Sequence, residues 1–192
     1  MQPIQSFAES YLQRVQIVLE SIRTADLQAV ADLVLETYRA ERTIFVVGNG
    51  GSASTASHMG CDLNKATAAP GRAYPRVLSL TDNVAWFSAL ANDIGYESVF
   101  VEQLRHLFRP GDLLLAISAS GNSPNVVRAM EFVNANGGRS VAFVGFGGGR
   151  MKQIAHACVH LKGEDYGPVE DGHLILNHLF TEYLRAHLHA RA

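Results

Sequence analysis

The chain has 192 residues, 47% of them hydrophobic, and its 16 Lys and Arg against 18 Asp and Glu give a formal net charge of −2. This composition is typical of a globular protein and lacks the basic surface that attracts nucleic acid or an anionic membrane, so we expect neither partner. The start shows no basic-then-apolar signal pattern, and no apolar run approaches the ~20 residues of a membrane span. Cys61 and Cys158 belong to no CxxC pair, so we expect reduced thiols and a cytoplasmic location.

Apolar residues recur at near-helical spacing over residues 4–23, and a second helix is expected to reach residue 40 with Asp26 as its cap. A parallel sheet does not need two helices ahead of its first strand. We therefore expect residues 1–40 to be a helical oligomerisation segment, within a single domain that spans residues 1–192.

The rest of the chain alternates strands with helices. We expect strands over residues 43–47, 77–80, 113–117, 140–144 and 157–161. We expect helices from about residue 53 and over residues 83–90, 98–107, 124–136, 151–155 and 169–188, with a turn at residues 92–96. This alternation predicts an α/β three-layer sandwich, in which helices cover both faces of a parallel sheet.

Two Gly- and Ser-rich turns follow strands of this predicted sheet. Gly48-Asn49-Gly50-Gly51-Ser52 comes after the first strand, and Ser118 to Ser123 follows the third. Free N–H groups at a helix start bind anions, and hydroxyl groups add further donors. A serine-capped helix would explain the second turn if it stood alone, but two such turns at strand carboxyl ends predict a phosphate site. Neither turn has the spacing of a nucleotide-binding loop, so we expect a small phosphorylated molecule.

Four polar side chains on two predicted helices could hold a metal ion. His58 and Asp62 are four residues apart and share a helix face, while Glu170 and His178 are eight apart on the last helix. Each histidine taken alone is more often solvated or capped than a ligand. Together the two carboxylates and two imidazoles suit a divalent ion, most simply zinc, with nickel and manganese left open.

The motifs GNGGSASTASH, AND, ISASGNS and E-x7-H resemble those of the sugar-isomerase (SIS) domain family, and within it the phosphoheptose isomerases. The resemblance covers nearly the whole chain. It implies a flavodoxin-like α/β fold and a homotetramer with sites built between subunits. It also implies that sedoheptulose 7-phosphate and D-glycero-D-manno-heptose 7-phosphate are interconverted through an enediol, an early step toward surface heptose.

The resemblance also assigns site residues. The candidate substrate contacts are Asn49, Gly50, Gly51, Ser52, Asp62, Asn92, Asp93, Ser118, Ala119, Ser120, Ser123 and Glu170. His58 and His178 match the zinc-binding histidines of the family. Asp62 stands where the family has a glutamate that is both ligand and catalytic base, and Glu170 stands where it has a glutamine that binds metal and substrate.

These departures leave the roles of the two acids open. Asp62 is one methylene shorter than glutamate, and proton transfer is sensitive to errors of ~1 Å, so either Asp62 or Glu170 is the base. His178 is either an acid or only a ligand. Two further differences are Ala119 in place of threonine and Ala66, next to Lys65, in place of arginine.

Two other functions stay open beside phosphoheptose isomerisation. One is isomerisation of another phosphosugar at the same site. The other is a non-catalytic protein that binds a phosphosugar or assists replication initiation, as some relatives that resemble this family do. A binding protein has little need of two acids and two histidines, so their presence favours the enzyme.

Overall fold

The computed structural model describes residues 2–67 and 74–189. Its strands are β1 (Thr43–Val47), β2 (Arg76–Ser79), β3 (Leu113–Ser118), β4 (Arg139–Val144) and β5 (Ala157–His160). Its helices are α1 (Ile4–Glu20), α2 (Thr24–Arg39), α3 (Gly51–Ala66), α4 (Val84–Asp93), η1 (Tyr96–Ser98), α5 (Val99–Leu107), α6 (Pro124–Ala135), α7 (Gly149–Ile154) and α8 (Tyr166–His189).

The five strands form one parallel sheet in the order β2-β1-β3-β4-β5. Each neighbouring pair is in parallel register, for example Ile44 with Leu113 and Val46 with Leu115 between β1 and β3. The chain leaves β1 for β2 on one side and returns to β3 on the other, so the order reverses between β1 and β3. This is the flavodoxin-like arrangement, and ligands in it bind beyond the strand ends at that reversal point.

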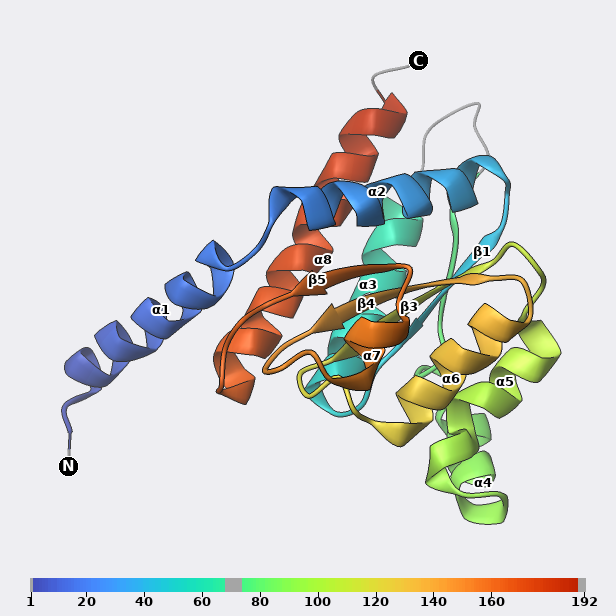
Figure 1. The fold of residues 1–192 in the computed structure, drawn as a ribbon, viewed down its shortest axis with the longest axis horizontal. Coiled ribbons are helices and arrows are strands. Elements are labelled where there is room, and N and C mark those ends of the chain that lie inside the picture. Colours follow the sequence, from blue (N-terminus) through green and yellow to red (C-terminus); the bar gives the residue numbers. More distant parts are fainter. Residues whose placement is uncertain (1, 68–73, 190–192) are drawn as a thin grey trace.

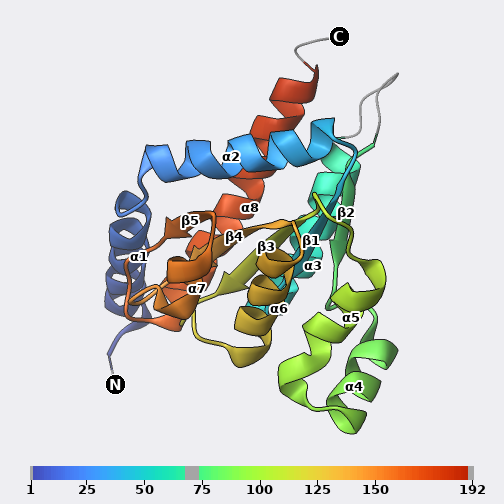
Figure 2. The same cartoon turned by 45° about the vertical axis from the view of Figure 1, so that its right-hand side comes forward.

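Side chains of each strand alternate between two hydrophobic cores. Ile44 and Val46 of β1 pack with α2, α3 and α8 on one face, whereas Phe45 and Val47 pack with α5, α6 and α7 on the other. Figure 2 shows these helices on the two sides of the sheet. The predicted three-layer α/β sandwich is therefore confirmed.

Small differences from the predicted boundaries have local causes. Helix α1 ends at Glu20 rather than near Arg23, and Arg23 rather than Asp26 is the N-cap of α2. The carbonyl of Arg23 accepts the first bond, from the N–H of Asp26 at 3.0 Å. Asp26 instead lies in the first turn, where its negative charge suits the positive end of the helix dipole.

Asn92 and Asp93 were expected in a turn, but they are the last two residues of α4. The helix continues because the N–H groups of Ile94 and Gly95 still reach the carbonyl of Leu90. Gly95 then takes a positive φ of 123°, which ends the helix.

None of the helices in the described part of the chain has the length and apolar content needed to cross a bilayer.

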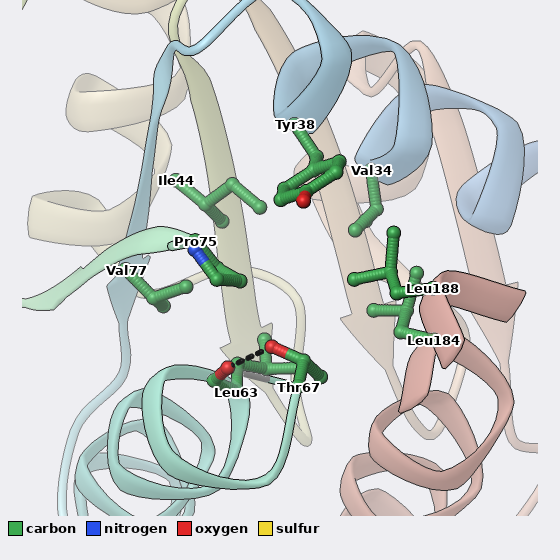
Figure 3. Close-up of a pocket in the computed structure, with 9 residues that line it drawn as sticks. All are labelled: Val34, Tyr38, Ile44, Leu63, Thr67, Pro75, Val77, Leu184 and Leu188. Carbon is green, nitrogen blue, oxygen red and sulfur yellow. Dashed lines mark hydrogen bonds between the residues drawn. The ribbon is translucent and has the colours of Figure 1, made fainter. Parts of the chain in front are cut away.

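A small apolar cavity marks the end of one core. It has a volume of about 10 Å³ and is lined by Val34 and Tyr38 of α2, Ile44 of β1, and Leu184 and Leu188 of α8, among others. Figure 3 shows these side chains pointing toward a common space. Ligand pockets measure roughly 300–1,000 Å³, so this space is a packing gap and not a substrate site.

Candidate functional site

The turns after β1 and β3 are joined by a pair of asparagines. The side-chain amide of Asn49 donates to Oδ1 of Asn125 at 2.9 Å, and the amide of Asn125 donates back to Oδ1 of Asn49 at 2.9 Å. The hydroxyl of Tyr96 donates to the same Oδ1 of Asn49 at 3.0 Å. These bonds fix the two predicted anion-binding turns beside each other at the reversal point of the sheet.

The β3 turn gathers three serine hydroxyls at the start of α6. Oγ of Ser118 lies 3.4 Å from Oγ of Ser120 and 3.3 Å from Oγ of Ser123. Ser123 is the N-cap of α6 by position, but its side chain makes no capping bond to the helix and faces Ser118 instead. Hydroxyl donors beside a helix N-terminus form a neutral cradle for phosphate. The methyl group of Ala119 packs into the core, so only its backbone is available to a ligand.

The β1 turn leads into α3, and Glu170 of α8 lies against this helix start. A Cβ added at Gly51 would meet Oε2 of Glu170 at 2.3 Å, so the absence of a side chain at Gly51 is what lets the carboxylate approach. A negative charge is favoured at a helix N-terminus. Gly50, the N-cap of α3, has a positive φ of 55°, which glycine adopts at little cost. Ser52 is buried in the first turn.

Three of the four predicted metal ligands come together where α3 packs against α8. Oδ2 of Asp62 lies 3.1 Å from Nε2 of His58 and 3.8 Å from Nε2 of His178. The three donor atoms lie within 4.8 Å of one another, and the two imidazole rings meet edge-on at 5.1 Å. The side chain of Asp62 is 24% exposed and those of the histidines about half exposed, so the cluster opens to solvent.

This donor set fits a divalent ion of the zinc type. Zinc takes tetrahedral nitrogen and oxygen ligands at about 2.0–2.2 Å, and catalytic sites keep three protein ligands with one open position. The carboxylate of Glu170 is not part of the cluster, because it lies at the start of α3.

A row of buried polar side chains runs along α8 behind the cluster. Asn177 is fully buried, and its amide donates to Oδ2 of Asp62 at 2.9 Å. His173 is also fully buried and stacks on Phe143. Burial lowers the pKa of His173 to about 4, although the backbone of Val144 opposes the shift. Neither ring nitrogen meets hydrogen-bond geometry with any described residue, so His173 is a neutral core residue.

Asn92 and Asp93 lie at the exposed end of α4 and bond to each other at 2.8 Å. Within the described residues no hydrogen bond joins either side chain to the β1 turn, whereas Tyr96, a few residues further on, donates to Asn49 of that turn. Sequence reasoning missed Tyr96 and Asn125 and gave no role to Asn177. The partners of Asn125 and Asn177 are 76 and 115 residues away, and no local pattern signals such contacts.

Comparison with known proteins agrees with this geometry. A model of the SIS domain matches residues 9–145. A phosphoheptose isomerase from Akkermansia muciniphila is 37% identical over 85% of this chain and 86% of its own length. One from Mycobacterium tuberculosis is 32% identical over 96% of this chain and 93% of its own.

The solved structure of a phosphoheptose isomerase from Neisseria gonorrhoeae superposes with a TM-score of 0.84 at 27% identity. The match covers 95% of this chain and 96% of that one, so the likeness extends beyond the sheet to the leading helices. By its sequence, its sheet order and these matches, the chain belongs to the SIS domain family.

Proposed function

We propose that this protein, a phosphosugar isomerase by its family and relatives, interconverts sedoheptulose 7-phosphate and D-glycero-D-manno-heptose 7-phosphate. The observation that carries the proposal is that a candidate phosphate site and a candidate metal site lie near each other. The serine cradle lies beside the β1 turn, and the His58, Asp62 and His178 cluster lies on α3, the helix that leaves that turn. His58 is seven residues into α3 from Gly51, about 10 Å along the helix axis.

The serine cradle supports binding of the phosphate, with Ser118, Ser120 and Ser123 as donors. The reacting end of the sugar then extends toward α8. When a divalent ion is bound by His58, Asp62 and His178, the chemistry it supplies is polarisation of the sugar carbonyl.

We assign the proton transfer between C1 and C2 to Glu170. Oδ2 of Asp62 is already engaged by His58 and by the amide of Asn177, which supports a ligand role. Glu170 lies at the β1 turn, outside the donor cluster, and its carboxylate has no hydrogen-bond partner among the described side chains that would hold it away from substrate. The proton that leaves one carbon returns to its neighbour through an enediol, so no oxidant is required.

The assembly is proposed to be a cytoplasmic homotetramer with sites at subunit interfaces, built as one domain over residues 1–192. Helix α1 extends away from the sheet in Figure 1 and leaves Ile4, Phe7, Leu12 and Ile17 at least half exposed. Apolar side chains in such numbers on one helix support an interface between copies of this chain through residues 1–40.

The test is turnover of sedoheptulose 7-phosphate by the purified protein with added zinc. We expect turnover in the wild type and its loss in His178→Ala. Glu170→Gln, which installs the residue typical of the family, should keep zinc and lose turnover if Glu170 is the base. Full turnover in Glu170→Gln would return that role to Asp62. Tight phosphosugar binding with no turnover in the wild type would favour a binding protein instead.

A further inference from the structure

Asn177 of α8 donates a hydrogen bond to the carboxylate of Asp62, whereas His178 of the same helix approaches that carboxylate only to 3.8 Å. It is fully buried, its Nδ2 donates to Oδ2 of Asp62 at 2.9 Å, and its own Oδ1 has no hydrogen-bond partner among the described residues. A buried amide oxygen without a partner is destabilising. The side chain is therefore poorly suited to a purely structural role, in which an apolar residue would pack better.

The orientation of this amide follows from the chemistry of its neighbour. An ionised carboxylate only accepts hydrogen bonds, so the NH2 end of Asn177 must face Asp62 and the oxygen must point into the protein. The same oxygen of Asp62 lies 3.1 Å from Nε2 of His58 and 3.8 Å from Nε2 of His178. Asn177 thus approaches the carboxylate from the protein interior, while the histidines approach from the open side.

The bond also joins the two helices that supply the cluster. Asp62 and His58 belong to α3, whereas Asn177 precedes His178 on α8. Figure 1 shows these helices next to each other. The side chain of Asp62 is 24% exposed, so without this bond only His58, on its own helix, would hold the carboxylate, and nothing on α8 would keep it near His178.

We propose that Asn177 is a positioning residue that holds Asp62 between the two histidines and so sets the affinity of the cluster for a first-row divalent cation. The inference rests on the proposed function in one respect, that this cluster binds a metal ion. Partners of this kind behind a ligand typically change metal affinity 10–100-fold.

The experiment is a zinc titration of the full-length protein against a chromophoric chelator. Asn177→Leu keeps the branched shape with the same number of side-chain heavy atoms and removes the amide, and we expect its zinc dissociation constant to rise at least tenfold. Thr181→Val is the matched control, since Thr181 is buried on the same helix face, has an unpaired hydroxyl and makes no bond to Asp62. Its zinc affinity should equal that of the wild type. Asn177→Ala is the second variant if Asn177→Leu does not fold.

A double-mutant cycle separates positioning from general damage to the helix. If Asn177 acts through Asp62, then Asn177→Leu has no further effect on zinc affinity in the Asp62→Ala background, where the acceptor of its hydrogen bond is absent. An equal loss in both backgrounds, or wild-type affinity in Asn177→Leu and Asn177→Ala, would overturn the inference while leaving the metal centre in place. If the wild type does not bind zinc, both the proposed metal centre and the proposed role of Asn177 are wrong.

Discussion

At the scale of single residues, a glycine and an acid lie in close contact at the start of α3. Gly51 has no side chain, and the carboxylate of Glu170 occupies the space that a Cβ would need. Because the carboxylate lies at the start of α3 beside the β1 turn, a small displacement would move it relative to any sugar bound there. Displacements of ~1 Å can cost about 100-fold in rate.

We therefore predict that Gly51→Ala lowers kcat/KM for sedoheptulose 7-phosphate by about 100-fold. The added methyl group would overlap Oε2 of Glu170 and displace it. Steady-state kinetics measures the loss. Gly147→Ala is the control, because no described atom lies within 4 Å of a Cβ built there and its φ is not positive. Equal kinetics in the two variants would contradict a role for the Gly51–Glu170 contact.

At the scale of elements, α8 carries its buried polar residues at every fourth position, His173, Asn177 and Thr181. This spacing places them on one face of the helix, directed at the sheet and α3. Hydrophobic side chains such as Leu176 and Phe180 share that face and provide the packing. The polar row therefore weakens the core locally, and its one direct link to the cluster is the bond from Asn177 to Asp62.

Burial of His173 predicts that stability falls in acid. Its pKa is lowered from 6.5 to about 4 in the folded state, so between these values the unfolded chain binds a proton that the folded chain does not. Stability from this residue is complete above pH 6.5 and is lost as the pH falls toward 4, by about 2 kcal/mol at pH 5.

Urea unfolding at pH 7.5 and pH 5 measures this loss. His173→Phe keeps an aromatic ring against Phe143. In this variant the free energy of unfolding should differ between pH 7.5 and pH 5 by about 2 kcal/mol less than in the wild type. His106→Gln, a change at an exposed histidine of α5, should leave the difference unchanged. A His173→Phe variant with the full wild-type pH dependence would show that other groups cause it.

At the scale of the whole molecule, the sheet brings distant parts of the chain to one edge while α1 stays outside it. Val18 of α1 packs into the core, but Ile4, Phe7, Leu12 and Ile17 of this helix stay exposed. Tyr11 and Arg14 bond to Asp171 and Asp165 near the start of α8. Helix α1 is thus held beside α8 with Phe7 and Leu12 directed at solvent. An interface at this helix would lie near the end of α8 that carries Glu170.

We predict that Phe7→Asp combined with Leu12→Asp lowers the oligomeric state. Two charges placed on this apolar surface disfavour its burial against another copy. Size-exclusion chromatography with light scattering reports the mass. Ala89→Asp is the control, since Ala89 is exposed on α4, outside residues 1–40. A tetramer in the double variant would place the interface elsewhere.

The sequence by itself determined the local structure and the chemistry of the two turns. Strand Thr43–Val47 was predicted to the residue, and the serines after β3 and the pairing of His58 with Asp62 on one helix face followed from spacing alone. These features depend on neighbours within a few residues, which is the range over which hydrophobic period and glycine, serine or proline act.

Only the tertiary structure decided which side chains meet across elements. It placed Asn177 on Asp62, paired Asn49 with Asn125, and set Glu170 against Gly51 and outside the His58, Asp62 and His178 cluster. Such contacts depend on how far each helix is rotated and shifted against the sheet and its neighbours. Packing of the whole core fixes these rotations and shifts of the helices, and no local pattern in the sequence encodes them.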